Sequence, residues 1–170
     1  NPQGVYGKSK LAGEQAIQNS GCKHVILRTA WVFGKHGNNF VKTMLKLGKA
    51  REELGVIGDQ FGGPTYAGDI ADAAIAIANQ YESTQQSGVY HYSGYPYVSW
   101  YEFAKSIFDY ANQAEIPLAL KTLNEIPATA YPLPAPRPAN SCLNCTKLES
   151  IFAITPSNWQ SALNRIKEYE

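Results

Sequence analysis

The segment HVILRTAWVF, residues 24–33, decides the fold class of this 170-residue chain. It contains an uninterrupted apolar run from Val25 to Leu27. A short continuous run of this kind is typical of a strand covered on both faces, as in a parallel sheet. The residues that follow this strand are small, β-branched or aromatic: Thr29, Ala30, Trp31 and Val32. Since parallel sheets bind ligands outside the carboxyl ends of their strands, these residues are a candidate wall of a binding site.

Predicted helices and strands alternate on both sides of this segment. Helical composition spans Tyr6 to Gln18 with Gly21 as the stop, and apolar residues recur at helical spacing from Phe40 to Gly48. Further helices are predicted over 67–80 and after the capping boxes formed by Ser99 with Glu102, Thr146 with Glu149, and Ser157 with Gln160. Further strands are predicted at 54–59, 88–94 and 118–123. The proline-rich stretch 126–138 is predicted to be an extended loop. The alternation indicates an α/β fold.

Composition places the chain among single-domain globular proteins. Hydrophobic residues make up 44% of it and charged residues 17%. The formal net charge of +1 does not indicate a basic surface for binding nucleic acid or an anionic membrane. No apolar run approaches the ~18 residues of a membrane span, and the polar first residues do not resemble a signal peptide. We therefore expect a cytoplasmic protein with no nucleic-acid and no membrane partner. Because the chain starts at Asn1 and its one methionine is Met44, we expect a fragment of a longer protein.

The cysteines favour free thiols. Cys22, Cys142 and Cys145 form an odd set, which suits a reducing compartment. The CLNC motif at 142–145 is compatible with a redox pair, or with half of a zinc site completed by Cys22 and His24. Zinc needs four ligands and no second C-x-x-C exists, so two small residues before a short helix are the preferred interpretation. We predict no metal site.

Two tyrosines precede a lysine by four residues: Tyr6 with Lys10, and Tyr101 with Lys105. Such positions share a helix face, and a nearby ammonium group favours the phenolate form of a tyrosine. A half-buried tyrosine and a solvated lysine explain the second pair, since it flanks an apolar stripe. The first pair has small neighbours that let a ligand approach closely: Gly4, Gly7, Ser9, Ala12 and Gly13. Spacing alone leaves a catalytic Tyr6 open.

Six blocks in order resemble the dTDP-4-dehydrorhamnose reductase family, a branch of the extended short-chain dehydrogenases/reductases: YGKSKLAGE, ILRTAWVFG, GNNFVKTML, DQFGGPT, GVYHYSG and PAPRPANSCLN. The resemblance implies the carboxyl-terminal part of such an enzyme, with a partial Rossmann-type parallel sheet and a small substrate-binding subdomain. Residues 1–170 would then interleave the end of the dinucleotide-binding domain with the substrate-binding domain. The family's glycine-rich amino-terminal half and its catalytic Ser/Thr would lie upstream. We therefore expect this chain alone to be inactive and to bind NADPH weakly.

The resemblance implies reduction of the 4-keto group of dTDP-4-dehydro-L-rhamnose to dTDP-L-rhamnose by NADPH or NADH. A carbonyl reduction needs a proton donor, so Tyr6 is the predicted general acid and Lys10 the charge that tunes it. The resemblance adds a hydrogen bond from Lys10 to the nicotinamide ribose. It also places Thr29, Ala30 and Val32 beside the cofactor, and Trp31 against the sugar. A core aromatic is the alternative for Trp31.

Other residues are predicted on the substrate side. Asn38, Asn39 and Phe40 open a helix whose free N–H groups suit a phosphate, and simple capping is the alternative. The loop with Gln60, Phe61, Pro64 and Thr65 resembles the family's nucleotide-side wall. Arg137 lies in a loop stiffened by prolines, a setting that suits phosphate binding. The resemblance places it near the substrate diphosphate, and a solvated surface arginine is the alternative. Gly68 stands where some relatives carry a magnesium-binding glutamate, so we expect no magnesium.

Two rival interpretations remain. One is a non-catalytic binding subunit on the same fold, such as the methionine adenosyltransferase regulatory subunit. The other is a different nucleotide-sugar enzyme, an epimerase or a fucose-type synthase. Retention of Tyr6, Lys10 and Trp31 favours the reductase. An open strand edge near 24–30 would pair with another copy, so we also expect self-association through residues 5–30. A physiological homodimer is left open.

Overall fold

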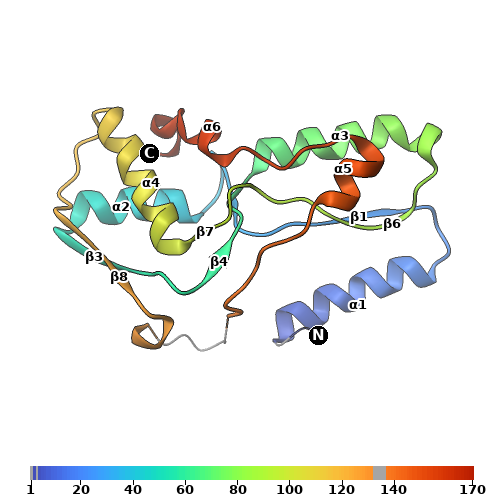
Figure 1. The fold of residues 1–170 in the computed structure, drawn as a ribbon, viewed down its shortest axis with the longest axis horizontal. Helices are drawn as coiled ribbons and strands as arrows, with labels where there is room; N and C mark the ends of the chain where they lie inside the picture. Colours follow the sequence, from blue (N-terminus) through green and yellow to red (C-terminus); the bar gives the residue numbers. More distant parts are fainter. Residues whose placement is uncertain (1, 3, 132–136) are drawn as a thin grey trace.

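A computed structural model describes residues 2, 4–131 and 137–170 of the chain. Helices alternate with short strands, and the strands named within these residues form four two-stranded pairs (Figure 1). Three of the pairs are parallel, and one is antiparallel. The predicted α/β class is therefore confirmed. Across the described residues, no helix is both long enough and apolar enough to cross a membrane.

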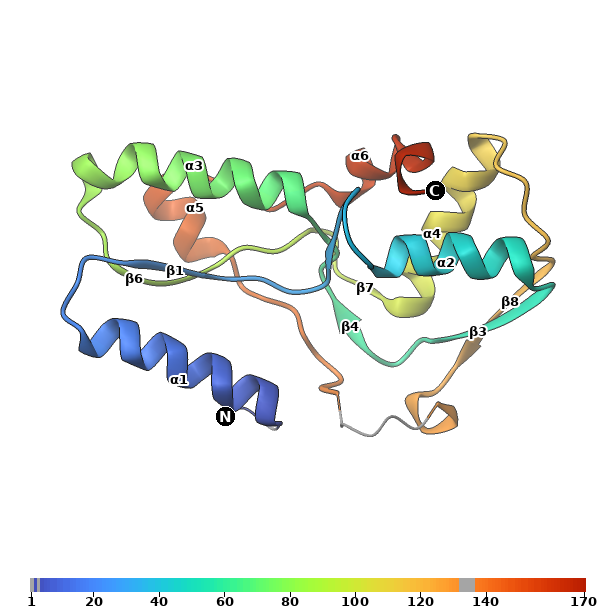
Figure 2. The same cartoon turned by 180° about the vertical axis from the view of Figure 1, so that it is seen from behind.

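One half of the molecule is built around β1 (Val25–Arg28) and β6 (Gly88–His91), which pair in parallel. Helices α3 (Ala67–Thr84) and α5 (Thr146–Phe152) lie on one side of this pair, and α1 (Val5–Asn19) lies on the other (Figures 1 and 2). The buried cluster of this half comes from α3, α5, β6 and the residue after it: Ala73, Ile77, Tyr90, Tyr92, Leu148 and Phe152. Helix α1 contributes no buried residue.

Strand β1 is less covered than its apolar sequence predicts. Its first three residues are half-buried, and Arg28 is exposed. Among the described residues β1 pairs along one edge only, with β6. A groove of about 320 Å³ stays open beside it, lined by apolar residues that include Val25, Leu27 and Ile77. The prediction of a strand covered on both faces is therefore wrong for this structure.

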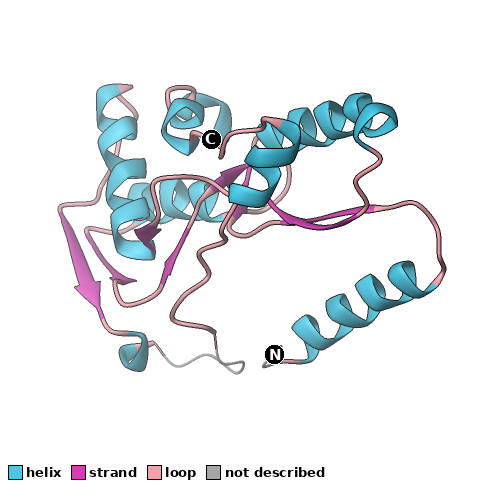
Figure 3. Cartoon of the chain, turned by 45° about the vertical axis from the view of Figure 1, so that its right-hand side comes forward, coloured by secondary structure: helices cyan, strands magenta, loops and turns pink. Residues whose placement is uncertain are grey.

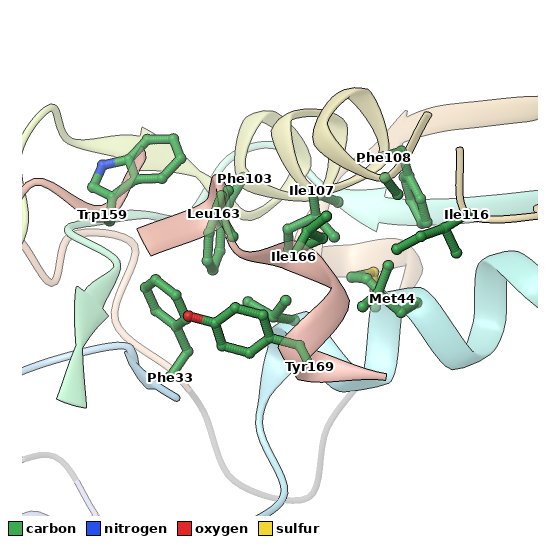
Figure 4. Close-up of a cluster of buried hydrophobic side chains, with 14 of the residues drawn as sticks. Phe33, Met44, Phe103, Ile107, Phe108, Ile116, Trp159, Leu163, Ile166 and Tyr169 are labelled. Carbon is green, nitrogen blue, oxygen red and sulfur yellow. The ribbon is translucent and has the colours of Figure 1, made fainter. Parts of the chain in front are cut away.

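The other half packs α2 (Phe40–Ala50) and α4 (Trp100–Gln113) together beside the parallel pair of β3 (Glu53–Ile57) and β8 (Thr122–Ile126). The chain returns to this core through α6 (Trp159–Leu163) and the 3-10 turn η2 (Ile166–Tyr169). Figure 4 shows side chains of α2, α4, α6 and η2 meeting in this core together with Phe33, among them Met44, Phe103, Ile107, Trp159 and Tyr169. This is the larger of the two buried clusters.

Short strands connect the two halves. Strand β2 (Val32–Phe33) pairs in parallel with β5 (Thr65–Tyr66), and β4 (Phe61–Gly62) pairs antiparallel with β7 (Val98–Ser99). Figure 3 shows these strands in magenta near the middle of the molecule. The loop predicted for 60–66 is thus partly paired. The residues after β1 and those of the 60–66 segment are therefore held side by side.

The helix starts test the predicted capping boxes. At α4 the box is confirmed, because the Glu102 N–H donates to Ser99 Oγ at 3.1 Å and the Ser99 N–H donates to Glu102 Oε2 at 2.6 Å. The boxes at Thr146 and Ser157 are wrong. The Thr146 N–H donates to Asn144 Oδ1, and α6 is capped by Asn158, which accepts from the Ser161 N–H.

The predicted strand 118–123 begins too early. The N–H groups of Ala119 and Leu120 both donate to the Gly48 carbonyl at the end of α2, and β8 pairs with β3 only from Thr122 onward. The predicted extended loop over 126–138 contains the 3-10 turn η1 (Ala128–Ala130), and its residues 132–136 lie outside the described residues.

Candidate active site

Tyr6 and Lys10 lie together on the first half of α1. The Lys10 ammonium sits over the Tyr6 ring, with 5.5 Å between Nζ and the ring centroid, and Tyr6 is 77% exposed. Tyr101 instead packs against the larger hydrophobic core. The two pairs therefore differ in environment as their contexts predict, and of these two tyrosines Tyr6 is the one open to a ligand.

An ion pair ties α1 to the carboxyl end of β1. Arg28 donates from Nε to Glu14 Oε1 at 2.8 Å and from one terminal nitrogen to Oε2 at 2.5 Å. This two-bond geometry fixes orientation as well as distance. The guanidinium of Arg28 holds the pKa of Glu14 below its ordinary value. Since α1 buries no residue, this pair is an important link between the Tyr6 helix and the sheet.

We expect the stabilising effect of this pair to depend on pH. The pKa of Glu14 is lowered in the folded chain, so the contribution is present above its ordinary value of 4.5 and is lost as pH falls through the lowered value. Glu14→Gln should therefore lower the urea midpoint of unfolding at neutral pH and have no effect well below pH 4.5.

Glu52→Gln is the matched control, because Glu52 and its partner Lys121 are both about 70% exposed, a setting in which ion pairs contribute little. A gap between Glu14→Gln and the unchanged protein that persists undiminished in acid would contradict the assignment.

Trp31 is held in place at the end of β1. It has a left-handed backbone φ of 49°, and its carbonyl accepts from the Thr65 N–H at 3.1 Å. Its indole stacks on Trp100, with 3.4 Å between ring centroids and 9° between planes. A Cβ on Gly62 would lie only 2.4 Å from the Trp31 ring, so only glycine fits beside it. Trp31 is half-buried, so both the sugar contact and the core role predicted for it remain compatible with the structure.

The other loop residues differ in exposure. Thr29 and Val32 are exposed and Ala30 is half-buried, so the residues predicted to lie beside the cofactor are accessible. Gln60 and Thr65 are buried, with 8% and 0% exposure. The Thr65 hydroxyl already has backbone partners in three segments. The structure therefore gives Thr65 a structural role, and direct ligand contact by Gln60 and Thr65 stays a prediction.

Asn39 is the N-cap of α2. Its Oδ1 accepts from the Lys42 N–H at 3.2 Å and its Nδ2 donates to the Gly34 carbonyl at 2.7 Å. The capping alternative is therefore what the structure shows for Asn39. Asn38 is exposed, and Phe40 packs on Trp100 with 4.6 Å between ring centroids. A ligand role is thus more readily available to Asn38 than to Asn39.

Arg137 is exposed and lies just before a segment that pairs with the 60–62 loop. The Phe61 N–H donates to the Ala139 carbonyl, and the Ser141 N–H donates to the Phe61 carbonyl, both at 2.8 Å. Two regions predicted to contact the substrate are thereby brought together, although they are more than seventy residues apart in sequence.

The cysteines show no ligand cluster. In the described part of the chain, no group of three His, Cys, Asp or Glu residues is arranged to hold a metal ion. All three cysteines are free, and burial raises the pKa of both Cys142 and Cys145. Cys145 directly precedes α5, as the preferred interpretation of CLNC has it.

Sequence reasoning missed two residues near this site. Neither Trp100, the first residue of α4, nor Gly62 is among the site residues predicted from the sequence. The adjacent glycines 62 and 63 are the one sequence signal for Gly62, because glycine is common where another group approaches the backbone closely. Nothing in a single sequence indicates that Trp100 meets Trp31.

Comparisons with known proteins agree over the whole chain. The family profile described as RmlD substrate binding domain matches residues 1–169. A dTDP-4-dehydrorhamnose reductase from Aggregatibacter actinomycetemcomitans is 50% identical over 99% of this chain and 58% of its own length. One from Escherichia coli (strain K12) is 49% identical over 97% of this chain and 56% of its own length.

A solved structure shows the same likeness. A dTDP-4-dehydrorhamnose reductase from Bacillus anthracis, in complex with NADP, has a TM-score of 0.82 and 40% identity, and the match covers 98% of this chain and 56% of that one. The chain thus spans little more than half the length of these relatives.

Proposed function

The chain belongs to the RmlD substrate binding domain family of the dTDP-4-dehydrorhamnose reductases, and from this premise we propose that the protein carrying it reduces dTDP-4-dehydro-L-rhamnose to dTDP-L-rhamnose. This chain would supply the substrate-binding part and the proton donor. NADPH or NADH would be the reductant, and the reaction belongs to dTDP-rhamnose biosynthesis. A cytoplasmic location is part of the proposal, since free thiols suit a reducing compartment.

The Tyr6–Lys10 arrangement supports this reaction. When bound, a reduced nicotinamide supplies a hydride to the C4 carbonyl carbon of the sugar. The Tyr6 hydroxyl gives its proton to the carbonyl oxygen, which becomes the 4-hydroxyl of the product. The Lys10 ammonium, 5.5 Å from the Tyr6 ring centroid, stabilises the phenolate that remains. Both groups fit a nicotinamide ribose and a sugar, because this face of α1 buries no side chain.

The rest of the site would hold the substrate. Trp31 stands at the carboxyl end of β1, where a sugar would contact its exposed part. Asn38 and the first N–H groups of α2 suit a phosphate, and Arg137 suits the diphosphate by two-bond pairing. Residues 1–170 would form one interleaved unit, since segments of the two halves alternate along the chain.

The single observation that carries this function is the difference between the two tyrosine–lysine pairs. Tyr6 is exposed beneath its lysine, whereas Tyr101 packs on the core. A non-catalytic binding subunit would need no exposed tyrosine beside a lysine. A homodimer is compatible with the open side of β1 and α1, and light scattering over a concentration series would show it.

The test is a turnover assay of the full-length protein with NADPH and a panel of keto-sugar nucleotides. We expect oxidation of NADPH with dTDP-4-dehydro-L-rhamnose and formation of dTDP-L-rhamnose. No oxidation with any nucleotide sugar would support the non-catalytic subunit. Inversion without net oxidation of NADPH would support an epimerase, and preference for a different keto-sugar nucleotide would support a fucose-type synthase.

A further inference from the structure

Thr65 is a buried polar residue at the meeting point of three segments. Its side chain is 0% exposed. Its hydroxyl lies 2.8 Å from the Ala30 carbonyl and 2.9 Å from the Gly63 carbonyl, and it accepts from the Gly94 N–H at 3.1 Å. A threonine hydroxyl has one hydrogen to donate, so it serves either carbonyl while accepting from Gly94. Thr65 therefore joins the segments that follow β1, β4 and β6.

These bonds act on the turn that carries Trp31. The hydroxyl holds the Ala30 carbonyl, and the Thr65 N–H donates to the Trp31 carbonyl at 3.1 Å, so one residue binds two successive carbonyls of the turn. Trp31 adopts φ 49° there, a left-handed conformation that is unfavourable for a non-glycine residue and needs support from its surroundings. This backbone conformation sets the direction in which the indole side chain leaves the chain.

The indole has little freedom beyond that set by its backbone. Trp100 lies 3.4 Å away in a stack, and Gly62 leaves no room for even one added carbon. A second hydroxyl strengthens the same junction, since Ser157 Oγ donates to Asp69 Oδ2 at 2.5 Å and lies 3.4 Å from the Tyr66 N–H. The residue after Thr65 is thereby also hydrogen-bonded, so both residues of β5 are tied to neighbouring segments.

We propose that Thr65 is a positioning residue whose hydroxyl holds the Ala30–Trp31 turn in the conformation that stacks Trp31 on Trp100. This inference rests on the proposed function in one respect, namely that Trp31 forms part of the substrate wall. This role takes the place of the direct substrate contact predicted for Thr65, since its side chain is 0% exposed. Thr65 acts through Trp31, so its loss should weaken substrate binding more than it slows the chemical step.

The test compares Thr65→Val, Thr65→Ser and Thr65→Ala in the full-length protein. The indole Nε1–H signal of Trp31, identified by its loss in Trp31→Phe, reports the stack because the Trp100 ring current shifts it. We expect Thr65→Val and Thr65→Ala to move this signal and to raise KM for dTDP-4-dehydro-L-rhamnose by about 10-fold or more, with a smaller change in kcat. Thr65→Ser should restore both.

Thr43→Val is the matched control, because the Thr43 hydroxyl also donates to a carbonyl, that of Asn39, but in an exposed part of α2. It should leave the Trp31 signal and KM unchanged. If Thr65→Val fails to fold, the comparison of Thr65→Ser with Thr65→Ala tests the proposal. Both variants lack the threonine methyl group, and they differ from each other only in the hydroxyl. Equal behaviour of Ser and Ala, or an unmoved Trp31 signal in Thr65→Val, would overturn the proposal. If the unchanged protein reduces no keto-sugar, the proposed function is wrong. The indole signal of Trp31 would still test whether the Thr65 hydroxyl holds the Ala30–Trp31 turn.

Discussion

Tyr6→Phe is expected to lower kcat of the full-length protein by about 10²–10⁴-fold, the usual contribution of a positioned proton donor. The substitution removes only the hydroxyl. Because the ring is 77% exposed and α1 buries no residue, the change should not alter the fold. Steady-state kinetics with NADPH and dTDP-4-dehydro-L-rhamnose would measure the loss, and an unchanged urea midpoint would show that the protein is intact.

Tyr101→Phe is the matched control for this result. Tyr101 also stands four residues before a lysine on a helix, but it packs against the hydrophobic core. It should keep kcat near that of the unchanged protein. Equal losses of kcat in the two variants would mean that the Tyr6 assignment is wrong.

Gly94→Ala should destabilise the chain by about 3 kcal/mol, at the upper end of the usual cost of overpacking. A Cβ at this position would lie 1.7 Å from the Pro64 carbonyl oxygen and 3.1 Å from a ring carbon of Trp159. The Gly94 N–H also donates to Thr65, so a shift of this backbone would disturb the Trp31 turn. Urea unfolding followed by circular dichroism would measure the loss.

Gly13→Ala is expected to have the opposite effect on the free energy of unfolding. Gly13 lies in the exposed middle of α1 with nothing within 4 Å of an added Cβ. Alanine is the better helix former, so the variant should gain about 0.5–1 kcal/mol. A loss of similar size in both variants would show that the close packing at Gly94 is not what decides its effect.

Local sequence rules predicted the elements that local chemistry determines. The helix predicted over 6–18 is observed over 5–19, and its predicted stop at Gly21 has φ 71°, as the freedom of glycine allows. The Ser99–Glu102 box was found because both of its bonds are made within four residues. The boxes at Thr146 and Ser157 failed for a local reason too. Asn144 accepts from the Thr146 N–H, Asn158 caps α6, and Ser157 is bound to Asp69 instead.

The arrangement of the site depends on contacts that no local pattern records. Trp31 meets Trp100 across almost seventy residues of sequence, and Thr65 reaches Ala30 and Gly94 from a third segment. The coverage of β1 was overestimated because an apolar run shows what a strand can bury, not which segments cover it. The predicted site residues came from residue chemistry together with the resemblance, and the structure separates exposed Asn38 from capping Asn39.

The most direct test of the central claim is transfer of deuterium from NADPH labelled at C4 of the nicotinamide. The full-length protein would be incubated with each of the two C4-labelled stereoisomers and dTDP-4-dehydro-L-rhamnose. NMR and mass spectrometry of the product would locate the label. We predict dTDP-L-rhamnose with deuterium at C4 of the sugar from one stereoisomer only, and almost none in the same time with Tyr6→Phe. Oxidation of the labelled NADPH without deuterium at C4, or no product at all from the unchanged protein, would contradict the account.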